Sequence, residues 1–172
     1  MMGLNSYLEA SPISVLSAEK VDDAFNARFD AIERRYLYRI FTRNARPSLD
    51  KFRVWHITKP LDIEAMTRAA QHLIGTHDFT SFRASQCQAK SPIRTIQSIE
   101  IEKIGDEVHI TAIARSFLHK QIRNITGNLV EVGKGRWHSD KIKEIREAKD
   151  RQAAGPAAPP YGLYLTDVIY PR

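Results

Sequence analysis

The sequence predicts an α+β fold built on a largely antiparallel sheet. Apolar and polar residues alternate from Arg35 to Phe41 and again from Ile99 to Ala114, which is the two-residue period of β-strands. Apolar residues recur every three to four positions after Asp62 and after Leu118, which is helical spacing. Strands joined by short turns, with helices placed irregularly between them, are typical of the α+β class.

The chain opens with a short apolar and polar segment, Met1 to Leu8, that reads as the end of an amphipathic helix running into a loop at Pro12. No capping residue precedes it. This start suits either a cut from a longer protein or a frayed natural N-terminus. We expect residues 1–24 to form a lead-in segment and residues 25–172 to form the main domain.

The first strand, Arg35 to Phe41, should carry one basic face, because its arginines alternate with Tyr36, Tyr38 and Ile40. The helix that begins after Asp62 should end at Gly75, which we predict to be its C-cap. A helical face is formed there by Ile63, Met66, Ala70, Leu73 and Ile74.

A β-hairpin follows, with alternation on both sides of a turn at Gly105-Asp106. The next helix should end near Gly133, and its apolar stripe comprises Leu118, Ile122, Ile125, Leu129 and Val132. A charged helix is expected at 140–149, irregular chain at 152–160 and a last strand at 161–170.

Composition is ordinary for a globular domain, with 42% hydrophobic and 27% charged residues in 172. The formal net charge of +6 favours an anionic partner. Nucleic acid is the leading candidate, and acidic lipid stays open. Cys87 is the only cysteine, so no internal disulfide can form and a reducing cytoplasm is the expected location. No apolar run is long enough to cross a membrane.

Basic residues are concentrated in two segments. Residues 28–53 hold eight against three acidic residues, and residues 115–136 hold five against one. Arginines interleaved with Tyr36, Tyr38 and Phe41 suit an RNA backbone and unstacked bases. The alternative is a strand whose basic outer face only keeps it soluble.

Several catalytic templates are excluded. The segment from Gly127 to Gly135 has five residues between its first glycine and Gly133, and Gly instead of Ser or Thr follows Lys134, so it is no phosphate-binding loop. His72 and His77 are five apart and do not share a helical face as a metal pair would. Cys87 has no evident local base, which favours an inert thiol.

Four ordered blocks resemble the tRNA pseudouridine synthase A family, and the resemblance extends from about residue 20 to the C-terminus. The blocks are Asn26-Ala27-Arg28-Phe29-Asp30-Ala31, Arg34-Arg35-Tyr36-Leu37-Tyr38, Gly75-Thr76-His77-Asp78-Phe79-Thr80-Ser81-Phe82-Arg83-Ala84 and Phe117-Leu118-His119-Lys120-Gln121-Ile122-Arg123-Asn124-Ile125-Thr126-Gly127. Gly162-Leu163-Tyr164-Leu165 fits as well.

The resemblance implies the C-terminal half of a pseudouridine synthase fold and an isomerase acting on uridines 38, 39 and 40 of the tRNA anticodon arm. It also implies a homodimer whose clefts bind RNA, and no metal or organic cofactor. The chemistry needs a carboxylate nucleophile, a stacking surface for the uracil and a cation that keeps the carboxylate ionised. The base must be extruded from its stack.

Three residues are assigned site roles by the resemblance. Tyr36 matches the tyrosine that packs against the uracil and is expected to help remove the C5 proton, the alternative being a core tyrosine. Arg123 matches the basic residue paired with the catalytic aspartate, although it lies about 140° from the apolar stripe, where a surface charge is the plain interpretation. Leu163 matches an apolar residue lining the uracil pocket, with a core leucine as the alternative.

Another three residues, Arg28, Phe82 and Arg83, lie in blocks that border the RNA cleft in the family. The family nucleophile belongs to an Arg-Thr-Asp-x-Gly-Val-His-Ala block that these 172 residues lack, and Asp30 does not replace it. We therefore expect a C-terminal portion that is inactive alone. The rival interpretation is a non-catalytic RNA-binding or dimerisation module on the same scaffold.

Overall fold

The computed structural model describes residues 2–171 and divides into two compact units, Met1–Asp30 and Ala31–Arg172. The first unit contains one short helix, α1 (Met2–Tyr7). The Asn5 side-chain amide donates to the carbonyl of Val15 at 3.0 Å and accepts the N–H of Val15 at 2.8 Å. The chain therefore folds back beside the helix. Near the end of the unit, the Asp30 carboxylate accepts the backbone N–H of Asn26 at 2.7 Å.

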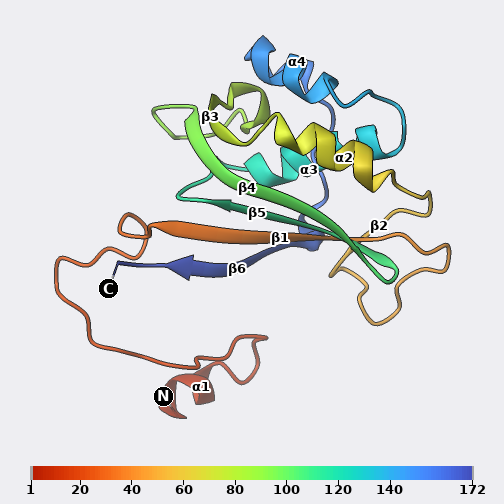
Figure 1. The fold of residues 1–172 in the computed structure, drawn as a ribbon. Helices are drawn as coiled ribbons and strands as arrows, with labels where there is room; N and C mark the ends of the chain where they lie inside the picture. The colour runs from red at the N-terminus through yellow and green to blue at the C-terminus, as the bar shows by residue number, and fades with distance from the viewer. Residues whose placement is uncertain (1, 172) are drawn as a thin grey trace. The chain divides into compact units, whose positions relative to one another are not determined.

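The second unit is built on a six-stranded sheet (Figure 1). Its strands are β1 (Glu33–Phe41), β2 (Trp55–His56), β3 (Gly75–Asp78), β4 (Ile93–Ile104), β5 (Glu107–Ala114) and β6 (Leu163–Ile169). The order is β2-β1-β5-β4-β3, and β6 also pairs with β1. Only β1 and β2 run parallel among the described pairs. The predicted α+β class with a largely antiparallel sheet is confirmed.

The longer helices of this unit lie on one face of the sheet (Figure 1). They are α2 (Ile63–Gln71), α3 (Gln121–Gly133) and α4 (Lys141–Ala148), with single turns of 3-10 helix at η1 (Thr80–Phe82), η2 (Arg151–Ala153) and η3 (Pro160–Gly162). The alternation in β1 places Tyr38 and Ile40 in the core beneath them, both with no exposed surface. Arg35 and Arg39 therefore project from the other face of the sheet.

The predicted C-cap at Gly75 is wrong. Helix α2 ends at Gln71 with His72 as its C-cap, and Gly75, with a φ of 100°, begins the edge strand β3. A left-handed glycine serves here to reverse the chain from helix to strand. The apolar residues Leu73 and Ile74 follow the helix in a turn instead of belonging to it.

Helix α3 also starts later than its apolar stripe. Leu118 is buried but lies in the preceding turn, where its N–H donates to the Gln121 side chain at 2.7 Å and Lys120 has a φ of 61°. The hairpin turn at Gly105-Asp106, the charged helix α4 and the last strand agree with the predicted positions. The two-residue strand β2 and the short β3 lacked a detectable pattern.

Candidate functional site

Arg123 is half-buried, whereas every other residue of α3 is buried. Its Nε donates to the carbonyl of Ala158 at 2.7 Å, and its own carbonyl accepts the N–H of Ala158 at 2.9 Å. Among residues 2–171, no carboxylate oxygen lies within 4 Å of this guanidinium. The positive charge of this half-buried guanidinium is therefore not neutralised by a carboxylate, which suits it to pair with an incoming anion.

The segment that holds Arg123 is itself bonded to α3. The Asn128 side chain accepts the N–H of Gly155 at 2.8 Å and donates to the carbonyl of Asn124 at 2.6 Å. Arg151 donates to the carbonyls of Ala154 and Gly155, both at 3.1 Å. These contacts fix the position of the segment that leads to Ala158. The carbonyl of Ala158 in turn orients Arg123.

Tyr38 lies next to this segment in the core. Its hydroxyl donates to the carbonyl of Pro159 at 2.6 Å. Burial raises the pKa of the Tyr38 phenol, and the positive charge of Arg123 acts in the opposite direction. The phenol therefore stays protonated and remains a donor at neutral pH. Tyr38 therefore has a structural role beside Arg123. The sequence alone did not distinguish this role from that of Tyr36.

Tyr36 and Leu163 share the sheet face of Tyr38. Tyr36 is two residues along β1, and Leu163 on β6 is the direct partner of Tyr38. The half-buried ring of Tyr36 meets Phe117 edge-on, with centroids 5.3 Å apart and planes at 86°. The structure thus brings Tyr36, Leu163 and Arg123 together around Tyr38.

The predicted RNA contacts Phe82 and Arg83 lie at η1. The Phe82 side chain is fully buried, and its carbonyl accepts the Asn124 amide at 2.8 Å, which ties η1 to α3. Arg83 is half-buried and precedes Ala84, whose N–H donates to the carbonyl of His119 at 3.0 Å. The RNA roles of both residues stay predictions.

Arg28, the third predicted RNA contact, belongs to the first unit, where its guanidinium lies 5.5 Å from the centre of the Phe29 ring. Its role is also a prediction.

Ion pairs reduce the basic character that the count of arginines suggests. Arg39 forms two hydrogen bonds with the carboxylate of Glu107, at 2.8 and 2.6 Å. Arg35 and Arg43 pair with Glu33 and Asp106, at 2.6 and 3.3 Å. Part of the basic face of β1 is therefore neutralised within the protein.

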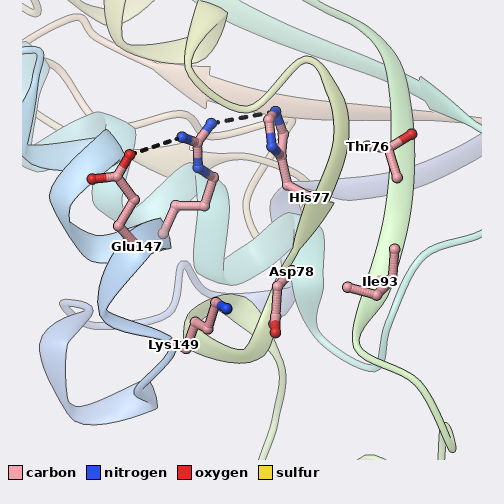
Figure 2. Close-up of a pocket in the computed structure, with 7 residues that line it drawn as sticks. Thr76, His77, Asp78, Ile93, Glu147 and Lys149 are labelled. Atoms are coloured by element: carbon pink, nitrogen blue, oxygen red, sulfur yellow. Dashed lines mark hydrogen bonds and ion pairs between the residues drawn. The ribbon is translucent and has the colours of Figure 1, made fainter.

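A surface pocket of about 360 Å³ lies elsewhere, at edge strand β3 and the end of α4 (Figure 2). The guanidinium of Arg146 bonds there to the His77 ring at 3.3 Å and to Glu147 at 3.2 Å, and it also donates to the carbonyl of His72. The positive charge of Lys149 acts on Asp78 across the pocket. Arg146 is paired with Glu147 at this pocket, and β5 and β4 separate the pocket from Tyr36.

Within residues 2–171, no three His, Cys, Asp or Glu side chains are grouped to hold a metal ion. Of the helices that the structure describes, none has the length and apolar character needed to cross a membrane.

Comparison with known proteins shows the family of the chain. Residues 69–171, which include Arg123 and Leu163, match the family model described as tRNA pseudouridine synthase. The chain belongs to the tRNA pseudouridine synthase family. This confirms the resemblance seen in the ordered sequence blocks, and the α+β structure agrees with it.

Members of the family are similar to nearly the whole chain. A protein of Caulobacter vibrioides named tRNA pseudouridine synthase A is 55% identical over 167 residues, which is 97% of this chain and 68% of the relative. Proteins of the same name from Rhodospirillum rubrum and Zymomonas mobilis are 50% and 51% identical, over 99% of this chain and 62% and 69% of their own lengths. The chain spans about two thirds of the relatives it matches.

The site roles of Tyr36, Arg123 and Leu163 stay predictions, and sequence reasoning missed the residues that support Arg123. Asn124 and Gly127 lie in the same block as Arg123, and that block was the available signal. Asn128 and Ala158 carried none, because a buried amide and a carbonyl in irregular chain have no sequence pattern.

Proposed function

We propose that this chain takes part in isomerising uridine to pseudouridine at positions 38, 39 and 40 of the tRNA anticodon arm. The observation that carries the proposal is the oriented, half-buried guanidinium of Arg123, which has no carboxylate partner among the described residues. The reaction needs such a cation. The names of the relatives supply tRNA as the substrate and pseudouridine synthesis as the reaction. In this proposal the enzyme works in the cytoplasm as a homodimer, without metal or organic cofactor.

The site residues would divide the chemistry. Arg123 holds the nucleophilic carboxylate ionised, since a nearby positive charge favours the charged form. Tyr36 packs against the uracil and helps remove the C5 proton, and Leu163 lines the pocket. The N1–C1′ bond breaks and the C5–C1′ bond forms. The proton lost from C5 is balanced by the proton gained at N1, so the product is an isomer. The blocks that contain Arg28, Phe82 and Arg83 border the RNA.

The nucleophile is proposed to come from outside these 172 residues, because they contain no Arg-Thr-Asp-x-Gly-Val-His-Ala block. Asp30 is engaged in a turn with the backbone of Asn26, which suits a structural role. On this proposal the chain alone binds RNA without modifying it.

The experiment measures pseudouridine in an unmodified tRNA transcript by carbodiimide-dependent primer-extension stops at positions 38 to 40. One arm uses the chain alone, and a second joins it to the part of the Caulobacter vibrioides relative that lies outside the match. We expect no stops in the first arm and clear stops in the second. In the joined protein, Arg123→Ala should slow modification about 100-fold, and Arg123→Lys should recover part of the rate.

Stops produced by the chain alone would mean that a carboxylate within it is the nucleophile. A joined protein that is folded and binds tRNA but makes no pseudouridine would favour the non-catalytic module.

A further inference from the structure

Phe52 is an exposed aromatic residue held in an unfavourable backbone conformation. Its φ is 64°, in the left-handed region that bulky side chains rarely adopt, and 70% of its surface is exposed. Such a conformation is strained and persists only when neighbouring contacts impose it. The ring contributes little to the core, since the chain is anchored by buried Val54 two residues later.

Contacts on both sides of Phe52 impose this conformation. The N–H of Arg53 donates to the carbonyl of Asp50 at 2.8 Å, which closes a tight turn around Phe52. The carbonyl of Arg53 accepts the Tyr164 hydroxyl at 2.6 Å, so the turn is tied to β6. The turn therefore presents the Phe52 ring to solvent at a defined place.

A second exposed ring lies beside it. Tyr161, in η3, is 45% exposed, and its ring centroid is 6.1 Å from that of Phe52 with an interplanar angle of 67°. Lys51 places its Nζ 5.1 Å from the centre of the Phe52 ring, and Arg53 on the other side is exposed. Two solvent-facing rings flanked by cations match the chemistry of a nucleobase joined to phosphates.

The pair is next to the proposed catalytic site. Tyr161 lies in the same short segment as Ala158 and Pro159. The carbonyl of Pro159 accepts the Tyr38 hydroxyl, and the carbonyl of Ala158 accepts the Nε–H of Arg123. The phenol of Tyr161 is close enough to act electrostatically on that of Tyr38. A nucleotide on these rings would therefore be a near neighbour of the one at Arg123.

We propose that Phe52 and Tyr161 form a stacking site for an unpaired nucleobase that neighbours the target uridine. The inference rests on the proposed function, because it takes RNA as the substrate. Aromatic and positive groups together favour RNA over an apolar protein surface, for which the flanking cations would have no partner.

The test uses the 172-residue chain and an anticodon stem–loop RNA carrying 2-aminopurine at each unpaired position in turn. Quenching of 2-aminopurine fluorescence reports stacking, and the dissociation constant is measured over a range of salt concentrations. The variants are Phe52→Gly, Phe52→Trp and Tyr161→Leu. The matched control is Leu49→Ala, an even more exposed apolar residue of the same loop, with 91% of its surface exposed.

Phe52→Gly should raise the dissociation constant about 5- to 100-fold, as loss of one base–ring stack does. It should not lower the thermal unfolding midpoint, because glycine adopts the left-handed conformation freely. The salt dependence should stay the same, since stacking neutralises no phosphate. Phe52→Trp should keep the affinity, Tyr161→Leu should weaken it, and Leu49→Ala should change it less than twofold.

Equal RNA affinity of Phe52→Gly and the wild-type chain would overturn the stacking site while leaving the proposed function in place. A changed oligomeric state in Phe52→Gly without a change in RNA affinity would also overturn it, and would identify a protein interface instead. If the wild-type chain binds no stem–loop RNA at all, the RNA contacts of the proposed function fail together with this site.

Discussion

Gly127 determines how closely the segment that orients Arg123 can approach α3. A Cβ built on this glycine would lie 2.0 Å from the carbonyl oxygen of Pro156 and 3.0 Å from the nitrogen of Ala158. Both neighbours are backbone atoms of the segment whose carbonyl holds the Arg123 guanidinium. A side chain at position 127 must therefore push that carbonyl away from Arg123.

Gly127→Ala should lower the free energy of unfolding by about 1–3 kcal/mol, the usual cost of overpacking, despite the better helix propensity of alanine. Urea unfolding of the whole chain measures it. The control is Gly3→Ala in α1, where nothing lies within 4 Å of the added atom and the change should be neutral or slightly stabilising. Equal stability of the two variants would show that the segment yields without cost.

Strands β1 and β5 are joined across their outer face by a charged cluster. Arg39 and Glu107 form two hydrogen bonds, and the His109 ring contacts the same carboxylate at 2.7 Å. The hydrogen bonds from Arg39 hold the pKa of Glu107 below its ordinary value, with burial acting in the opposite direction. The cluster contributes to stability only while this carboxylate is ionised.

The stabilising contribution of Glu107 should be present above its unfolded-state pKa of about 4.5 and be lost as the pH falls through its lower folded-state value. Glu107→Gln should therefore be less stable by about 1–2 kcal/mol at pH 7, and the difference should shrink toward pH 3. Thermal unfolding across that range measures it. Glu100→Gln, at an exposed position of β4 opposite Thr111, is the control. A difference that does not change with pH would rule out the ionised carboxylate as its source.

At the scale of the whole molecule, the location of positive charge matters more than its total. The chain carries a formal charge of +6, but several arginines of the basic segments are paired internally. RNA binding should therefore depend on particular residues. With three to four phosphate contacts, tRNA affinity should fall on the order of 100-fold between 50 and 200 mM salt.

Charge reversal tests whether particular residues or the net charge alone govern RNA binding. Replacing Arg28, Arg35 and Arg123 together by Glu should weaken tRNA binding by at least about 10-fold and flatten the salt dependence. Reversal of Arg68, Lys103 and Lys143, on α2, β4 and α4, changes the net charge equally and should have a much smaller effect. Filter binding at several salt concentrations measures both. Equal losses in the two triple variants would show that net charge alone governs binding.

The sequence by itself determined the elements whose cause is local. Alternation located β1 and the hairpin of β4 and β5, helical spacing located α2, α3 and α4, and ordered blocks identified the family. Period and turn chemistry act over a few residues, so they can be read directly. The short strands β2 and β3 were not predicted, because two to four residues are too few to show a period.

Only the tertiary structure decided the environment of the site. Helical spacing puts Arg123 away from the apolar stripe of α3, yet it is half-buried, because irregular chain 35 residues later covers that side of the helix. The strained Phe52 and its partner Tyr161 likewise meet across more than 100 residues. Such contacts depend on how the elements pack against one another. Packing brings together residues that are far apart in the chain, and no local sequence pattern records such a contact.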